Sequence, residues 1–231
     1  MKRVKMFCLP YAGGSAIYYS RWSEYFPKAI EVIPVELAGR GRRLDHPFYQ
    51  DLSAALEDVY GFIKDSIVDN DPYILFGHSM GAILSYELCK QIKALNVHKP
   101  LHLFVSGLEA PKAILNEKIY HNMSDEQLKK EMIDMGGTPP EFFDYKELEQ
   151  IFLEILRNDF RIVETYKCQC DIKIDTDITV FYGSDEMDRE DVIGWMNHTE
   201  KKCNIYEFKG RHFFINNYLK QIIEIICDAI K

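Results

Sequence analysis

The segment at residues 77–81, Gly-His-Ser-Met-Gly, constrains the fold of this chain more than any other. It follows an apolar run at residues 73–76 and precedes a segment with a helical pattern at residues 82–94. A strand, a G-x-S-x-G turn and a helix in this order are typical of a nucleophile elbow, which exposes the serine hydroxyl. The glycines let neighbouring backbone pass closely, and the helix N-terminus favours negative charge developing beside the serine. Ser79 is therefore the candidate nucleophile.

Strand-like and helical patterns alternate along most of the chain. The expected strands are residues 4–9, 31–35, 73–77, 101–106, 178–182 and 204–208, and the expected helices are 16–29, 52–68, 82–94, 191–196 and 214–230. This alternation predicts an α/β fold with a mostly parallel central sheet flanked by helices. The length suits a single domain over residues 1–231.

One segment, residues 112–167, interrupts this alternation because it lacks a strand pattern. It contains two helical patterns, at residues 124–135 and 145–165, separated by Gly-Gly-Thr-Pro-Pro at residues 136–140. We expect a helical insertion above the carboxyl edge of the sheet, where ligands bind in folds of this kind. Its role is either a lid over the site or helix packing without gating.

Composition narrows the classes of function. The net charge of −8 argues against nucleic acid or an acidic membrane surface as the main partner. No apolar run approaches a membrane span, and the N-terminus reads as a first strand rather than a signal peptide, so a cytoplasmic protein is expected. The six scattered cysteines are expected to be reduced. Cys168-Gln169-Cys170 lacks the second ligand pair that a metal site needs, so neither metal nor cofactor is expected.

The serine needs a base, and the chain has seven histidines. In folds with this elbow the order along the chain is serine, acid, histidine, which favours His212, in a loop between the last strand and an apolar helix. His78 is adjacent to the serine, so its side chain is expected to point away and pack. His198 lies at a helix end and is expected to face solvent.

The acid that orients the histidine should follow an earlier strand. Asp185 comes just after the expected strand and the turn at Gly183, and it is the preferred candidate. Glu186, Asp188 and Asp191 are nearby rivals. Helix capping is the alternative role for Asp185.

An oxyanion hole needs two N–H donors. The backbone of Met80, directly after the nucleophile, should supply one of them. The second is expected from the glycine-containing loop at residues 10–16, after the first strand. A phosphate-binding loop is the rival interpretation of this segment, but the chain lacks the P-loop lysine and the G-x-G-x-x-G pattern.

At this point the chain resembles the type II thioesterases of nonribosomal peptide and polyketide assembly lines, a branch of the α/β-hydrolases. The matching segments are residues 10–16 (PYAGGSA), 37–43 (LAGRGRR), 77–82 (GHSMGA), 136–140 (GGTPP), 156–160 (LRNDF), 164–166 (ETY) and 210–214 (GRHFF). The resemblance covers nearly the whole chain. It implies a Ser79–Asp185–His212 triad, oxyanion N–H groups from Ala12 and Met80, and a mobile helical lid. Ala38, Leu108 and Arg211 depart from the usual family residues.

The resemblance also implies an activity and a partner. Family members hydrolyse acyl thioesters on the phosphopantetheine arm of acyl or peptidyl carrier domains, and thereby clear stalled or wrong acyl groups from the synthase. The alternatives are a carboxylesterase or medium-chain acyl thioesterase with a free substrate, and a non-catalytic protein on a hydrolase scaffold. A monomer is expected.

Two groups of side chains each have two alternative roles. The basic cluster of Arg40, Arg42 and Arg43 either docks the carrier domain or lies in a solvated loop. Arg40 alone could instead join neighbouring loops through hydrogen bonds. Met132, Met135, Phe142 and Phe143 either line an acyl channel or pack between helices.

Overall fold

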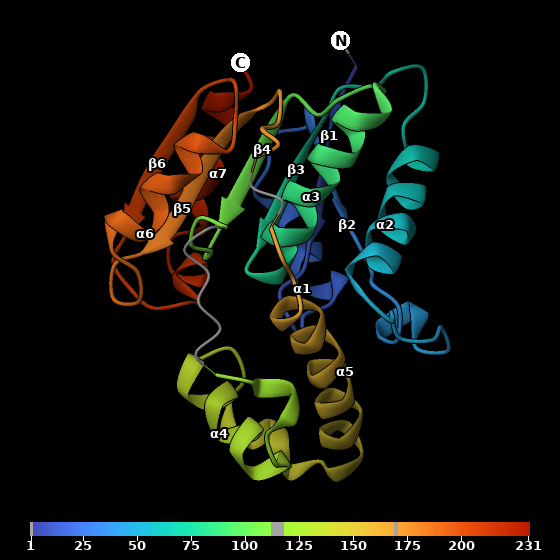
Figure 1. Ribbon diagram of the computed structural model, residues 1–231, viewed down its shortest axis with the longest axis vertical. Helices are drawn as coiled ribbons and strands as arrows, with labels where there is room; N and C mark the ends of the chain where they lie inside the picture. Colours follow the sequence, from blue (N-terminus) through green and yellow to red (C-terminus); the bar gives the residue numbers. More distant parts are fainter. Residues whose placement is uncertain (1, 112–117, 169–170) are drawn as a thin grey trace.

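The chain folds around a single parallel sheet. The computed structural model describes residues 2–111, 118–168 and 171–231 (Figure 1). Six strands pair in the order β2-β1-β3-β4-β5-β6, all parallel. They are β1 (Val4–Leu9), β2 (Ile30–Pro34), β3 (Tyr73–His78), β4 (His102–Ser106), β5 (Asp177–Gly183) and β6 (Cys203–Phe208). The predicted α/β-hydrolase sheet is confirmed, with strand ends shifted by one residue or less.

The central strands are buried on both faces. Every residue of β3 and of β4 is buried, which explains why both read as continuous apolar runs rather than as alternating patterns. Strand register also aligns the carboxyl ends, because Gly77 pairs with Leu9 on one side and with Val105 on the other. The loops that follow β1, β3 and β4 therefore emerge next to each other.

Helices cover both faces of the sheet. α2 (Leu52–Ser66), α3 (Met80–Leu95) and α6 (Arg189–Ile193) contribute to one buried apolar cluster. α1 (Ala16–Ser20) and α7 (Leu219–Ala229) contribute to the other. Three expected helices are shorter than predicted because part of each is a 3-10 turn: η1 (Arg21–Glu24), η5 (Gly194–Asn197) and η6 (Phe214–Asn216).

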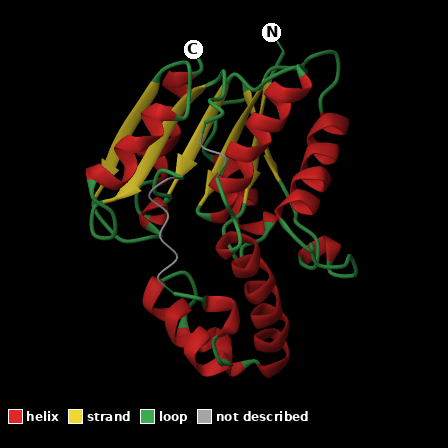
Figure 2. Cartoon of the chain, in the orientation of Figure 1, coloured by secondary structure: helices red, strands yellow, loops and turns green. Residues whose placement is uncertain are grey.

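The expected insertion contains only helices and turns over its described residues, 118–167. It comprises η3 (Tyr120–Asn122), α4 (Asp125–Met135), η4 (Pro140–Asp144) and α5 (Lys146–Glu164), which lie together beyond the carboxyl ends of the strands (Figures 1 and 2). Ser124 and Gln127 form a capping box that starts α4, and Gly136 ends it with φ of 80°. Residues 112–117 of the expected insertion lie outside the described residues.

The cysteines depart from the expectation in one place. Cys8, Cys89, Cys203 and Cys227 are free, and burial raises the pKa of the Cys8 and Cys89 thiols. Cys168 is disulfide-bonded, so the expectation of six reduced cysteines is wrong, and Gln169 and Cys170 lie outside the described residues. No helix of the described chain is both long and apolar enough to cross a membrane.

Candidate active site

Ser79 occupies a strained turn between β3 and α3. Its φ and ψ are 54° and −117°, a conformation that costs about 1–3 kcal/mol and persists only where the surroundings enforce it. The Ser79 N–H donates to the Ser106 carbonyl at 2.8 Å. A Cβ at Gly77 would lie 2.1 Å from the Gly81 carbonyl oxygen, and one at Gly81 would lie 2.2 Å from that of Leu9. Both glycines of the motif are therefore required by close backbone contacts.

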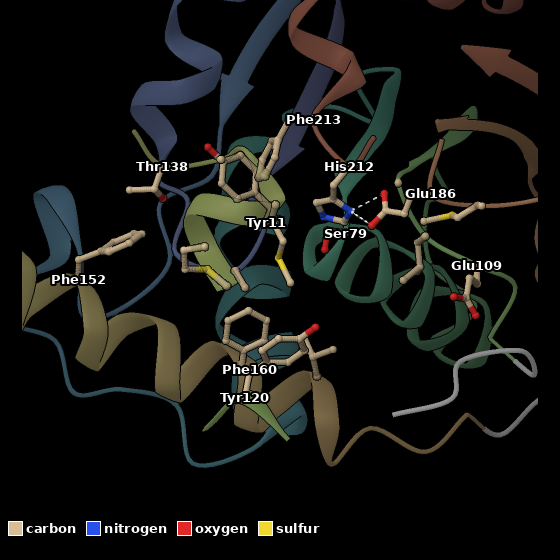
Figure 3. Close-up of a pocket in the computed structure, with 18 residues that line it drawn as sticks. Tyr11, Ser79, Glu109, Tyr120, Thr138, Phe152, Phe160, Glu186, His212 and Phe213 are labelled. Atoms are coloured by element: carbon tan, nitrogen blue, oxygen red, sulfur yellow. Dashed lines mark hydrogen bonds and ion pairs between the residues drawn. The ribbon is translucent and has the colours of Figure 1, made fainter. Parts of the chain in front are cut away.

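His212 reaches the same site from the loop after β6. A Cβ at Gly183 would lie 2.5 Å from the Gly210 carbonyl oxygen, so the bare backbone of Gly183 lets this loop cross the end of β5. Gly210 itself has φ of 135°, a conformation that favours glycine. His212 and Ser79 line one cavity, and Figure 3 shows Ser79 below the imidazole ring.

The carboxylate beside His212 belongs to Glu186, one residue after the predicted Asp185. His212 Nδ1 lies 3.0 and 3.1 Å from the two carboxylate oxygens of Glu186 (Figure 3). The Asp185 carboxylate instead pairs with Lys209, whose side chain is largely exposed. The structure therefore does not bring Asp185 to His212, and the sequence-based choice of Asp185 over its neighbour is corrected.

The tight turn after β5 explains this one-residue difference. Both the Glu186 and Met187 N–H groups donate to the Gly183 carbonyl, at 3.2 and 3.1 Å, so successive side chains point in different directions. The backbone of Asp185 is held in place because its N–H donates to the Gly210 carbonyl at 2.9 Å. Glu186 and Met187 line the cavity. The signal in the sequence is the spacing from Gly183, since the third residue after this glycine, Glu186, lies beside His212.

The two rival histidines are both buried. His78 is fully buried, and its Nδ1 lies 2.9 Å from Ser106 Oγ. Burial, with the neighbouring His212, holds the pKa of His78 well below its usual range, which fits the predicted packing role. His198 is only 1% exposed and its Nδ1 lies 2.9 Å from Tyr86 Oη, so the expectation that it faces solvent is wrong.

The expected oxyanion loop is a type II turn. The Gly14 N–H donates to the Tyr11 carbonyl at 2.8 Å, and Gly13 has φ of 77° at the third turn position. The Ala12 N–H is not used by the turn's own hydrogen bond and belongs to a residue that lines the cavity. Met80 is the first residue of α3, where an N–H has no partner within the helix. Ala12 and Met80 therefore stay the predicted oxyanion donors.

The cavity has a volume of about 240 Å³ and mainly apolar walls. Its lining combines the site residues with side chains of the insertion, namely Tyr120, Met132, Met135, Phe152, Phe160 and Val163. Phe142 and Phe143 are not among the lining residues, and both rings pack near Phe152 instead. The two methionines line the cavity and also pack in the apolar cluster of the insertion, so both hypotheses stay open for them, whereas the two phenylalanines do not line the cavity.

The basic cluster separates into three different environments. Arg40 is 2% exposed and ion-paired with Asp159. Burial lowers the pKa of its guanidinium, but the charge and hydrogen bond of Asp159, together with the nearby Tyr49 and Glu36, raise this pKa overall. Arg43 pairs with Asp58, and only Arg42 is exposed. Arg40 is thus unavailable for docking, and its partner Asp159 is not among the site residues expected from the sequence.

Comparison with known proteins shows the family to which this chain belongs. The thioesterase domain family matches residues 4–230. The gramicidin S biosynthesis protein GrsT of Aneurinibacillus migulanus is 33% identical, over 99% of this chain and 90% of that protein. The medium-chain S-acyl fatty acid synthase thioesterase of Rattus norvegicus is 29% identical, over 96% and 88%. The type II thioesterase BorB of the borrelidin biosynthetic cluster superposes with a TM-score of 0.90 at 28% identity, covering 99% of this chain and 93% of BorB. This chain therefore belongs to the thioesterase family, among the type II thioesterases of nonribosomal peptide and polyketide pathways.

Proposed function

We propose that this protein hydrolyses acyl thioesters carried on the phosphopantetheine arm of acyl or peptidyl carrier domains, and so clears stalled or wrong acyl groups from a synthase. Ser79 is the nucleophile, His212 the base and Glu186 the acid that orients it. The observation that carries the proposal is the cavity itself. One apolar space brings together a strained serine, a histidine and a carboxylate.

In the acylation step His212 takes the Ser79 proton as Ser79 Oγ attacks the thioester carbonyl. The Glu186 carboxylate, beside Nδ1, holds the imidazole tautomer and stabilises the imidazolium that forms. The N–H groups of Ala12 and Met80 bind the oxyanion. When the tetrahedral intermediate collapses, the C–S bond breaks and His212 protonates the departing pantetheine thiolate.

In the deacylation step water attacks the Ser79 ester. His212 takes a proton from this water, and the same two N–H groups hold the second oxyanion. The C–O bond to Ser79 then breaks and His212 returns the proton to Ser79 Oγ. The products are a carboxylic acid and a carrier with a free thiol, so the carrier is restored for another cycle.

A second candidate is hydrolysis of free or fatty-acyl-carrier medium-chain thioesters. The apolar walls contributed by Met132, Met135 and Phe160 suit an alkyl chain, and the rat relative is a medium-chain thioesterase by name. The two functions share their chemistry and differ in what carries the acyl group. Relative rates on acyl-carrier, acyl-CoA and oxygen-ester substrates separate them.

The deciding experiment is intact-mass spectrometry of acylated carrier domains incubated with wild type or with Ser79→Ala. We expect wild type alone to release the acyl group and leave a free pantetheine thiol, with a loss of about five to six orders of magnitude in the variant. Carriers that stay acylated while a simple ester or acyl-CoA is cleaved would support the second candidate. Equal activity of Ser79→Ala would contradict both functions.

A further inference from the structure

Asp159 and Arg40 form an ion pair that is almost completely buried. The two side chains are 1% and 2% exposed. The pair is bidentate, with Arg40 Nη1 2.7 Å from Asp159 Oδ2 and Nη2 2.6 Å from Oδ1. Removing two charges from water is costly, and such pairs are often no more stabilising than well-packed apolar residues. Stability alone is therefore a weak explanation for this pair.

The pair also binds backbone of the oxyanion loop. The Gly13 N–H donates to Asp159 Oδ2 at 2.8 Å, and Arg40 Nη1 donates to the Gly14 carbonyl at 3.0 Å. Asp159 comes from α5 in the insertion, whereas Arg40 comes from the loop after β2. Three segments that are distant in sequence therefore meet at one carboxylate.

The Gly13 contact fixes the form of the turn. Types I and II differ in the orientation of the peptide between the two central residues, here the Ala12–Gly13 peptide. Because the Gly13 N–H points at Asp159, this peptide is held in the type II orientation. The preceding peptide is held by the Gly14 N–H on the Tyr11 carbonyl. Both peptide groups that flank Ala12 are thus restrained, and so is the direction of the Ala12 N–H.

Packing supports the same restraint. A Cβ at Gly13 would lie 2.7 Å from Leu156 Cδ2 and 2.9 Å from Phe152 Cε2, both on α5. The helix therefore rests directly on the loop, one and two helical turns away from the Asp159 contact. Displacement of α5 would remove the hydrogen bond and the packing together.

We propose that Asp159 is a positioning residue for the thioesterase reaction, which holds the Ala12 N–H in place for the oxyanion through Gly13 and Arg40. The insertion thereby supplies part of the catalytic machinery in addition to the walls of the acyl cavity. This inference rests on the proposed function, since it assigns Asp159 to the same reaction.

The test replaces the ion pair by apolar residues of similar size. In Asp159→Leu/Arg40→Met no charge is left unpaired, so a folded protein with a melting temperature near that of wild type is expected. Gly13 loses its acceptor, and we expect kcat to fall by about 10- to 100-fold, up to the loss seen when an oxyanion donor is removed. KM should change little. The matched control is Asp58→Leu/Arg43→Met, which removes a neighbouring ion pair that does not contact residues 11–14.

A second readout separates positioning from mere stability. A trifluoromethyl ketone with the same acyl chain forms a tetrahedral adduct with Ser79, so its affinity should fall by the same factor as kcat. A non-hydrolysable thioether analogue, which carries no oxyanion, should bind as it does to wild type. Unchanged kcat and ketone affinity in the folded double variant would overturn the proposal, as would an equal loss in the control pair.

Two further measurements keep the result decisive. Should the double variant fail to fold, Asp159→Asn/Arg40→Gln also leaves no buried charge unpaired and gives the Gly13 N–H a weaker, neutral acceptor. A smaller drop in kcat at unchanged KM then supports the proposal, and wild-type kcat overturns it. Wild type and Ser79→Ala are assayed in parallel on thioester and oxygen ester. If only the ester is cleaved, the proposed function fails, while the same comparison on the ester still tests Asp159.

Discussion

The sheet body and the helical insertion are stabilised in different ways. The body, meaning the described residues outside 118–167, has a large apolar cluster on each face of its sheet, and one of these clusters also includes Ile162 of α5. The insertion has one small cluster, formed by Leu128, Met132, Leu153 and Leu156 with partly buried neighbours. The body places the reacting groups through close backbone contacts, whereas the insertion supplies side-chain walls. The two regions therefore differ in the size of the apolar core that stabilises them.

Polar contacts join the two regions. Asn158 Nδ2 donates to the Tyr49 carbonyl at 2.8 Å. Arg161 donates to the carbonyls of Gln50 and Tyr49 at 2.6 and 2.8 Å. Together with the buried Asp159 pair, these bonds lie on one side of α5. Because hydrogen bonds are directional, this polar interface fixes the orientation of α5 more strongly than a purely apolar interface would.

The largest expected effect concerns the body alone. Glu186→Gln keeps the shape of the side chain but removes the charge that orients His212, and we expect kcat to fall by about 10⁴-fold. Asp185→Asn, one residue away, should leave kcat near that of wild type because its partner Lys209 is exposed. Steady-state kinetics on one acyl-carrier substrate compare the two. The reverse ranking would return the role to Asp185.

The next largest effect is a loss of folding stability when a glycine in close backbone contact is replaced. In Gly77→Ala the new Cβ meets the Gly81 backbone, so we expect a loss of at least about 3 kcal/mol in the free energy of unfolding. Gly61 in α2 has open space around it, and Gly61→Ala should stabilise by about 0.5–1 kcal/mol. Urea denaturation measures both. A Gly77→Ala protein as stable as wild type would show that the elbow tolerates a shift.

Matched core truncations separate the two regions directly. Leu75 in the body and Leu128 in the insertion are both fully buried, and either Leu→Ala change should cost about 2–5 kcal/mol locally. We expect Leu75→Ala to speed amide exchange throughout the chain, and Leu128→Ala to speed it mainly in α4 and α5. Hydrogen exchange with peptide-level mass spectrometry distinguishes these patterns. Uniform acceleration in Leu128→Ala would mean that the two regions unfold as one.

The smallest effect is a pH dependence in the body. Burial lowers the pKa of His102 to about 4, with Asp177 opposing the shift. In the unfolded state His102 has a pKa of about 6.5 and binds its proton first. Protonation therefore favours the unfolded state, and stability is lost as pH falls from about 6.5 to 4. We expect about 2 kcal/mol less stability from His102 at pH 5 than at pH 7. In His102→Gln, denaturation should show a shallower decline over this range, and an unchanged slope would exclude His102 as its source.

Sequence patterns predicted the parts of the site that depend on local structure. The elbow, the parallel sheet and His212 follow from short patterns and from the chain order of elements, and the structure brings Ser79 and His212 to one cavity. The choice between Asp185 and Glu186 depended on the direction of successive side chains in a tight turn, which composition does not determine. The Arg40–Asp159 pair joins residues 119 positions apart, and no local pattern specifies such a partner.

The separation between Gly13 and Asp159, 146 residues, sets an order of events during synthesis. A growing chain holds its nucleophile elbow and the glycine turn long before the carboxylate that restrains that turn has been made. His212 arrives later still. Nascent and truncated chains that end before α5 therefore carry Ser79 without Asp159 or His212. In the proposed reaction His212 is the base, so thioester hydrolysis would begin only when nearly the whole protein has been made.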